Sequence, residues 1–283
     1  MKTRRDSGRK SLIDEMPKEA IMNIINDLEP GTFDLHIHTC ASDGVFTPAE
    51  VVEKASAMGL QTIAITDHDT VAGVAEAMAA SQSTSLTVIP GVEIRTRWRK
   101  YNVDVLGYNL RDLHQMQQQL RILHEERNER ARRIIDKFRQ FNMPITMEDV
   151  RQYSGNSVIT RPHIAKAIVA KGYLYSVRDV FRHYLGDGRP ACVDLTGLSL
   201  EEGIQMIHDA GGVAVLAHPY CFKNPTHIEE MIALGLDGLE VWHREHRLRD
   251  VNKLIRLAEK HHLFVTGGSD FHHDAHPLGR FLI

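Results

Sequence analysis

The sequence contains few cysteines, no long hydrophobic run and no large excess of charge of one sign. The three cysteines, Cys40, Cys192 and Cys221, are odd in number and form no C-x-x-C pair. This argues against a disulfide framework and against a zinc site built on cysteine, and it is typical of a reducing compartment. No run approaches the ~20 apolar residues of a spanning helix, and no apolar signal segment follows the basic residues 1–10. We therefore expect a cytoplasmic protein.

Composition limits the fold and the partners only broadly. The net charge of -3 over 283 residues means that the whole molecule does not attract nucleic acid, so any preference for anions must be local. The length allows one large α/β domain with an insertion, or two modest domains. Histidine is the exception, because the chain has 17 and many stand beside aspartate in short motifs.

The clearest motif is DLHIHTCASD at residues 34–43. If residues 33–38 form a strand, His36 and His38 point to the same side of it, because side chains alternate along a strand. Two neutral imidazoles there suit a transition metal, and the aspartates of the motif could orient a ligand or become one. Taken alone, an H-x-H pair is more often two surface or hydrogen-bonded histidines, so the rest of the chain has to decide.

A unit of helix, short apolar strand and polar residue recurs along the chain. Capping boxes mark two of the helix starts, Thr47 with Glu50 and Ser199 with Glu202. Strands are predicted at residues 61–66, 86–89, 213–216, 239–241 and 263–266, and helices at residues 48–58, 72–81 and 252–260. This alternation indicates a parallel sheet, and in a parallel barrel the strand ends gather on one face. We therefore expect the polar residues at the strand ends to converge.

A helical segment separates the two halves of this pattern. Apolar residues keep a helical period from residue 112 to residue 141, through sequence rich in arginine and glutamate, which predicts a long amphipathic helix. Further helices are predicted at residues 147–153, 162–171 and 177–185. The domain prediction is a polar tail (1–32) with a short helix around residues 18–28, a barrel in two parts (33–111 and 197–283), and a helical insertion (112–196) over the open face of the barrel.

Eight imidazole or carboxylate side chains stand at predicted strand ends: His36, His38, Asp43, His68, Glu93, His218, Asp270 and His272. This number exceeds the needs of one metal ion and fits a cluster of two or three Mn, Fe or Zn ions. A carboxylate such as Glu93 could bridge two of them.

The motifs occur in an order that resembles the PHP (polymerase and histidinol phosphatase) family of the amidohydrolase superfamily. D-x-H-x-H-x-x-x-S-D-G is followed by T-D-H-D, G-V-E, A-H-P and S-D-F-H over residues 33–283. The resemblance implies a distorted (β/α)7 barrel and commonly three metal ions. It assigns to the first ion His36, His38, Glu93 and Asp270, to the second Asp43, His68 and His272, and to the third His218 with a shared Glu93. This chain has Asp104 where the family has a further histidine, so the third site could be weak or empty, and Asp104 could be an ordinary strand-edge residue.

Within that family, the segment Arg161-Pro162-His163 and the helical insertion resemble a subgroup with two related activities. It dephosphorylates nucleoside 3',5'-bisphosphates and trims short 5'-phosphorylated oligonucleotides from the 5' end. Arg161 offers a planar guanidinium and His163 a second donor near a helix N-terminus, so both could hold the distal phosphate. An ion pair with a neighbouring helix is the alternative for Arg161. Arg127 and its basic neighbours alternate with acidic residues, which favours a solvated, internally paired face.

The resemblance predicts hydrolysis of a phosphate ester by water that the metal ions activate, with His218 or Asp270 relaying protons. The expected partner is a nucleotide or a short oligonucleotide, and we expect neither a membrane nor a required protein partner. Three alternatives stay open at this point: a histidinol-phosphate phosphatase, a C–N hydrolase or deaminase, and a non-catalytic module that binds metal and nucleic acid. The sequence also leaves the metal, the main substrate and the oligomeric state open.

Overall fold

The computed structural model describes residues 29, 31–155, 159–186, 188–193, 198–222 and 224–281. The short helix expected around residues 18–28 lies outside this part of the chain. Within the described part, no helix is both long enough and apolar enough to cross a membrane.

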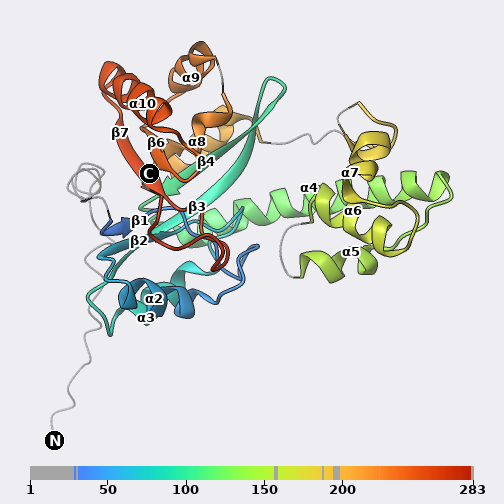
Figure 1. Cartoon of the computed structure of the whole chain (residues 1–283), viewed down its shortest axis with the longest axis horizontal. Coiled ribbons are helices and arrows are strands. Elements are labelled where there is room, and N and C mark those ends of the chain that lie inside the picture. Colours follow the sequence, from blue (N-terminus) through green and yellow to red (C-terminus); the bar gives the residue numbers. More distant parts are fainter. Residues whose placement is uncertain are drawn as a thin grey trace, which may run out of the picture.

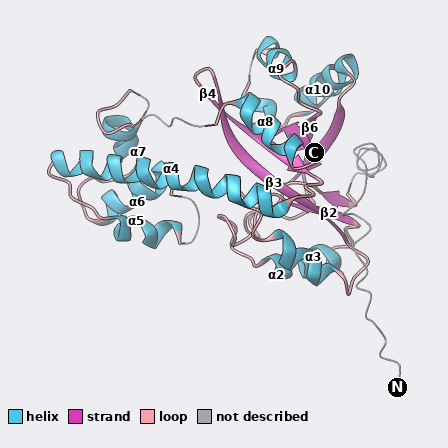
Figure 2. Cartoon of the chain, turned by 180° about the vertical axis from the view of Figure 1, so that it is seen from behind, coloured by secondary structure: helices cyan, strands magenta, loops and turns pink. Residues whose placement is uncertain are grey.

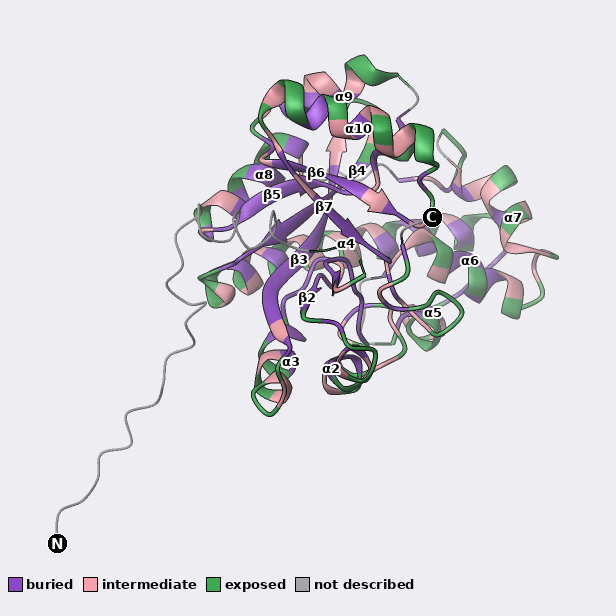
Figure 3. Cartoon of the chain, turned by 60° about the vertical axis from the view of Figure 1, so that its left-hand side comes forward, coloured by how far each residue is buried: buried purple, intermediate pink, exposed green. Residues whose placement is uncertain are grey.

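Seven strands form one sheet whose spatial order follows the chain. They are β1 (Phe33–Asp34), β2 (Thr62–Ile65), β3 (Thr87–Trp98), β4 (Tyr101–Tyr108), β5 (Val213–Leu216), β6 (Gly238–His243) and β7 (Phe264–Gly268). The backbone after β7 returns to the start of the sheet, where a parallel bridge joins Ile37 and Phe271 and the Leu35 N–H donates to the Gly267 carbonyl at 3.1 Å. The sheet is therefore a nearly closed barrel, and its strands are buried along most of their length (Figure 3).

The barrel helices lie on the outside of the sheet, with α2 and α3 below the strands in Figure 1 and α8, α9 and α10 above them. Their bounds are α2 (Pro48–Ala57), α3 (Val74–Ser81), α8 (Leu200–Asp209), α9 (Pro225–Ile232) and α10 (Leu248–His261), with a short 3-10 turn at Pro219–Cys221. Both predicted capping boxes are present. The hydroxyls of Thr47 and Ser199 each accept the N3 backbone N–H, and the backbone N–H of each cap residue donates to the N3 carboxylate. The predicted distorted barrel with a helical insertion is confirmed.

The expectation of a wholly parallel sheet is wrong at β4. β1, β2 and β3 run parallel, as do β5, β6 and β7, but β4 is antiparallel to both of its neighbours. The reason is the link between β3 and β4, which consists only of Arg99 and Lys100, with Arg99 at φ 54°. A two-residue link makes a hairpin, whereas a parallel crossover needs a dozen residues or more. Strand β3 also continues to Trp98, so Glu93 lies within it rather than after its end.

The long helix α4 leads away from the barrel to a group of shorter helices (Figure 2). The elements of this segment are α4 (Leu113–Gln140), α5 (Met147–Ser154), α6 (Arg161–Ala170), α7 (Val177–Val180) and a π-helical turn at Phe181–Leu185. Asp112 caps α4, as its carboxylate accepts the Gln115 N–H at 2.8 Å. The first half of α4 packs on the barrel core through Met116 and Leu120, while residues 131–193 form a separate hydrophobic cluster. The domain boundaries stay a prediction.

Candidate metal centre

Imidazole side chains from distant parts of the chain converge on the carboxylate of Glu93, which is buried. Its Oε2 atom lies 3.3 Å from Nε2 of His36, 3.3 Å from Nε2 of His38 and 2.9 Å from Nδ1 of His68. Its Oε1 atom lies 3.1 Å from Nε2 of His218. The convergence expected from the order of the strands is therefore present.

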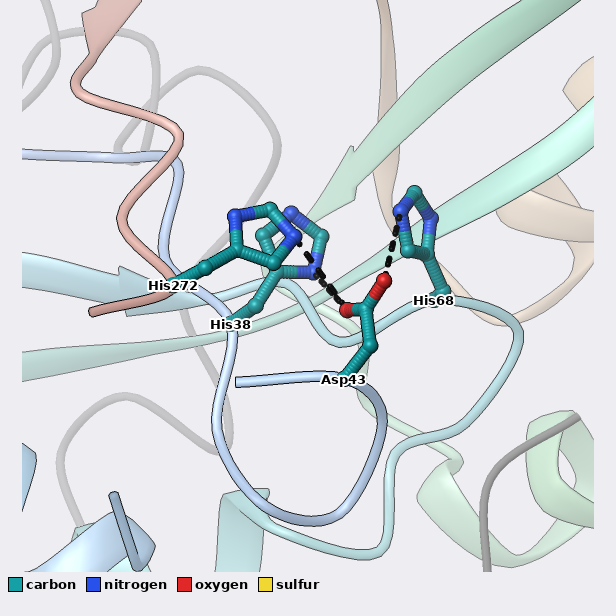
Figure 4. Close-up of side chains that lie close together, drawn as sticks. All are labelled: His38, Asp43, His68 and His272. Carbon is teal, nitrogen blue, oxygen red and sulfur yellow. Dashed lines mark ion pairs between the residues drawn. The ribbon is translucent and has the colours of Figure 1, made fainter. Parts of the chain in front are cut away.

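Asp43 is the centre of a second group of ligand atoms, which Figure 4 shows with three imidazoles turned toward its carboxylate. Its Oδ1 atom lies 3.2 Å from Nε2 of His272 and 3.7 Å from Nδ1 of His38. Its Oδ2 atom lies 3.9 Å from Nε2 of His68. The two groups share His38 and His68, and His38 also lies 3.2 Å from Asp270.

The residues present fit a cluster of divalent cations. Ligand atoms within 4.8 Å of one another form three sets, namely His38 with Asp43, His68 and His272, His36 with His38 and Asp270, and His36 with Glu93 and His218. Four of these atoms, Nε2 of His36, both ring nitrogens of His38 and Oε2 of Glu93, are buried without a hydrogen-bond partner among the described residues. Buried polar atoms without partners are costly. Metal ions bound in this cluster would supply partners for Nε2 of His36, Oε2 of Glu93 and one ring nitrogen of His38 in each of the two sets that contain His38.

Asp104 lies at the edge of this cluster, where it pairs with Arg95 across β3 and β4. Its two oxygens accept from Nε and Nη2 of Arg95 at 2.9 and 3.0 Å, whereas Nε2 of His218 is 3.9 Å away. Burial alone would raise the pKa of Asp104, but the charge of Arg95 outweighs burial and lowers it. The carboxylate that could hold a third ion is thus already neutralised by a bidentate arginine.

Glu240 on β6 orients two of the candidate ligands, and the sequence patterns did not single it out. Its Oε1 atom accepts from Nδ1 of His36 at 2.9 Å, and its Oε2 atom accepts from the backbone N–H of His218 at 2.6 Å. With Nδ1 of His36 engaged as a donor, Nε2 is directed into the cluster as a ligand. The signal that could have found Glu240 is a carboxylate between Leu239 and Val241 in an apolar strand.

Asp270 is held by Arg244, another residue that sequence reasoning missed. Nη2 of Arg244 donates to Oδ2 of Asp270 at 3.1 Å, and Nη1 donates to the carbonyls of Ser269 and Asp270 at 2.9 and 2.8 Å. Burial would raise the pKa of Asp270, but the neighbouring imidazoles of His243 and His38 outweigh burial and hold it well below its usual range. The backbone is left-handed at Asp270 (φ 52°) and at His218 (φ 29°), which marks strain at the centre itself.

Two further aspartates tie the motifs together without joining the ligand set. Asp34, which could have been a ligand, instead accepts from the Ser269 N–H at 2.9 Å and the Gly279 N–H at 2.7 Å. Asp67 accepts from the Thr39 N–H at 2.7 Å and from other donors of the same loop. These bonds fix the loops that carry the first, second and last motifs relative to one another.

A cavity of about 270 Å³ opens beside the Asp43 group, and we call it the His163 cavity. It is lined by His163 together with Asp43, His68, Arg95 and Arg127, among others. Nδ1 of His163 accepts the Thr160 N–H at 3.2 Å, so Nε2 is the ring nitrogen that can donate.

Arg161 does not line the His163 cavity. It lines a neighbouring cleft of about 360 Å³ between α6 and the β3–β4 hairpin, together with Arg97 and Lys100. Its Nη1 atom donates to the Leu185 carbonyl at 3.2 Å. The structure therefore brings His163, but not Arg161, next to the candidate ligands.

The prediction of a solvated, internally paired basic face on the long helix is right in part. Arg132 pairs with Glu129 at 3.0 Å, and both side chains are exposed. It is wrong for Arg127, whose side chain is only 11% exposed and forms an ion pair with the buried Asp69. Arg127 lies seven residues after the buried Leu120, so it falls on the face of α4 that is turned to the barrel.

Comparison with known proteins gives consistent matches. The model of the PHP domain matches residues 34–185. The chain is 35% identical over 248 residues to the 5'-3' exoribonuclease Rnm of Escherichia coli, which covers 85% of each chain. It is 35% identical over 246 residues to the 3',5'-nucleoside bisphosphate phosphatase of Chromobacterium violaceum, covering 84% of this chain and 86% of that one. A solved structure from Bifidobacterium adolescentis, assigned as a metal-dependent phosphoesterase, gives a TM-score of 0.71 at 35% identity, over 88% of this chain and 91% of that one.

Proposed function

Because this chain belongs to the PHP domain family, we propose that its histidine and carboxylate cluster makes it a metal-dependent phosphoesterase acting on nucleotides. The substrates are nucleoside 3',5'-bisphosphates, which lose their 3'-phosphate, and short 5'-phosphorylated oligonucleotides, which lose nucleotides from the 5' end. The observation that carries the proposal is the set of buried, unpartnered ligand atoms around Glu93. The named activities of the two similar enzymes support the choice of substrate.

One bond cleavage accounts for both activities. In either substrate the oxygen of water bonds to phosphorus, and the bond between phosphorus and the 3'-oxygen of the first nucleoside breaks. The 3'-oxygen leaves with a proton. The products differ only because the released phosphoryl group carries either nothing or the next nucleotide.

We propose a centre of two divalent ions, with manganese as the metal and iron or zinc as alternatives. The first ion is assigned to His36, His38, Glu93 and Asp270, and the second to Asp43, His68 and His272. When bound, such ions lower the pKa of water to about 7 and neutralise the charge that develops on the phosphoryl oxygens. We expect no ion at the third position, because Arg95 already engages Asp104.

An empty third position leaves His218 available for proton transfer. Its Nε2 atom lies 3.1 Å from Glu93, and its side chain is 22% exposed, so it can reach a substrate atom at the edge of the cluster. We assign to His218 the relay of protons during hydrolysis. Asp270, engaged by Arg244 and with its pKa well below the usual range, acts as a ligand rather than as the proton relay considered from the sequence.

The His163 cavity is the proposed site of the first nucleoside and its 5'-phosphate. We expect His163→Ala to raise the KM for adenosine 3',5'-bisphosphate about tenfold, since one hydrogen bond to a charged phosphate is lost. The KM for a nucleoside 3'-monophosphate, which has no distal phosphate, should stay the same.

The same comparison on Arg161→Ala tests the role expected from the sequence. If the preference for two phosphates is unchanged, Arg161 serves to hold the carbonyl of Leu185 and not the substrate.

A substrate comparison tests the function itself. The enzyme is purified with manganese, and phosphate release from adenosine 3',5'-bisphosphate is measured beside mononucleotide release from a 5'-phosphorylated short RNA. Histidinol phosphate serves as the comparison substrate. We expect both nucleotides to exceed histidinol phosphate in kcat/KM by at least about 100-fold. A preference for histidinol phosphate would support that alternative, and no turnover of any phosphate ester would support the non-catalytic module.

Protons and metal ions compete for the same ligands. Burial alone would lower the pKa of His38, but the carboxylates of Asp270 and Glu93, 3.2 and 3.3 Å from its Nε2 atom, outweigh burial and raise the pKa to about 10. Metal uptake at pH 7 is therefore expected to release about one proton from this group and to weaken by about tenfold for each pH unit lost. The pKa of His38 in the folded protein lies above its ordinary value of 6.5. Protonated His38 therefore stabilises the metal-free protein fully below pH 6.5, and this stabilisation is lost as the pH rises toward 10. Calorimetry in two buffers with different heats of ionisation measures the release, and uptake without protons would contradict the expectation.

The Asp104→Asn variant tests the two-ion assignment. Breaking the pair with Arg95 should lower the free energy of unfolding by about 1–3 kcal/mol, at the low end because the Arg95 side chain is 42% exposed and water can reach it. Metal analysis should still find two ions per chain in the variant. One ion fewer than in the wild type would identify Asp104 as a ligand.

A further inference from the structure

A second cavity, of about 480 Å³, opens at the other end of the ligand cluster from the His163 cavity. The His163 cavity reaches the group that contains Asp43 and His68, whereas the second cavity begins at Tyr220. The Tyr220 ring lies 6.4 Å from the ring of His218, a residue of the third ligand set. The second cavity, which we call the Tyr220 cavity, thus begins one side chain away from His218, although no candidate ligand lines it.

Tyr220 is a rigid aromatic platform in this position. Its ring stacks on that of His243 at 5.9 Å with an interplanar angle of 14°, and the ring of His246 meets it edge-on at 5.6 Å. Both histidines are buried, yet Tyr220 is 45% exposed. One face of the ring is therefore packed while the rest of it is open to solvent. An exposed aromatic ring held in this way can stack on a nucleic acid base of any type.

Cationic side chains line the Tyr220 cavity beyond this ring. Arg247 and Lys253 are among them, and neither lies within 4 Å of a carboxylate of the described residues. Arg249 and two carboxylates also line the cavity. The Asp250 carboxylate accepts the Arg247 N–H at 3.2 Å and lies 3.7 Å from Nε of Arg249, and the Glu245 carboxylate lies 4.0 Å from Nε of Arg244. An aromatic platform followed by cations matches a base followed by a phosphate diester.

We propose that the Tyr220 cavity binds the nucleotide that follows the scissile phosphate. Its base stacks on Tyr220, and its 3'-phosphate lies near Arg247 and Lys253. This assignment rests on the proposed function. During hydrolysis the second nucleotide stays bonded to phosphorus through its 5'-oxygen, and it departs as the new 5'-phosphorylated end. A nucleoside 3',5'-bisphosphate has nothing beyond its 3'-phosphate, so it does not use the cavity.

The test is the ratio of two specificity constants in one set of variants. kcat/KM is measured on a 5'-phosphorylated RNA of three adenylates and on adenosine 3',5'-bisphosphate. In Tyr220→Ala we expect the ratio of RNA to bisphosphate to fall about 10-fold, within the range that loss of one base stack produces. Tyr220→Phe keeps the ring and should keep the ratio. Tyr175→Ala, at a fully exposed tyrosine of the helical insertion, is the matched control.

A second variant tests the cations independently of the ring. In Arg247→Ala combined with Lys253→Ala, we expect a higher KM for the RNA and a weaker dependence of that KM on salt concentration, since two phosphate contacts are lost.

An unchanged ratio of RNA to bisphosphate in Tyr220→Ala would overturn the assignment. An equal loss on both substrates would also overturn it, because it would show that Tyr220 only supports His243. A wild-type enzyme that hydrolyses the bisphosphate but not the RNA also overturns it, whereas one that hydrolyses neither overturns the proposed function itself.

Discussion

Replacing Glu93 with glutamine is expected to reduce phosphoester hydrolysis at least about 1,000-fold, which corresponds to about 4 kcal/mol of transition-state stabilisation. The substitution keeps the size of the side chain and removes its charge. Glu93 is the buried carboxylate that four imidazoles approach within 3.3 Å, so its charge is the one that the cluster shares. Metal content per chain, measured by mass spectrometry, should fall together with the rate.

A matched control for this variant is Glu202→Gln. Glu202 is an exposed glutamate in the capping box of α8, away from the cluster. It should keep both metal content and rate, because glutamine can also serve at the third position of a capping box. The loss of a negative charge from the first turn of the helix should cost about 0.3–1 kcal/mol. Full activity in Glu93→Gln, with two ions still bound, would show that the carboxylate is not part of the metal centre.

Removal of the metal should abolish turnover in the wild-type protein. We expect dialysis against a chelator to lower the rate by at least about 10,000-fold, because water is no longer activated and the phosphoryl charge is no longer neutralised. Adding manganese should restore the rate. The melting temperature should rise by roughly 10 °C at the same time, since an ion that binds only the folded chain stabilises it by mass action.

The Glu93→Gln protein provides the control for this thermal shift. Its melting temperature should rise by less on addition of manganese than that of the wild type, because the first ion loses the Glu93 carboxylate. If metal-stripped wild-type protein hydrolysed the bisphosphate at full rate, the cluster would have a structural role and the catalytic assignment would be wrong.

Much of the candidate site could be predicted from the sequence, because each strand can be recognised from its own short run of apolar residues. Each short apolar run predicts a strand, and parallel strands place their ends on one face, so His36 and Asp270, which follow β1 and β7, could be brought together without coordinates. Glu93 joins them because β3 runs past the end of β2 and bridges to His68. The capping boxes defined helix starts for the same reason, since each depends on residues three positions apart.

The rest of the site depends on contacts that no local pattern encodes. Glu240 and Arg244 were missed because their roles arise from pairing with His36 and Asp270, which lie 204 and 26 residues away. The reversed direction of β4 follows from the tight turn at Arg99 and Lys100, and the sequence patterns did not distinguish this turn from a longer connection. Arg127 resembled its exposed neighbours in sequence, and only the docking of α4 on the barrel buries it against Asp69.

The most direct test of the metal centre is anomalous diffraction at the manganese absorption edge, from crystals of the protein grown with manganese. The account predicts two strong peaks. They should lie among His36, His38, Glu93 and Asp270, and among Asp43, His68 and His272. The absence of any peak in contact with these side chains, in crystals of an active preparation, would contradict it.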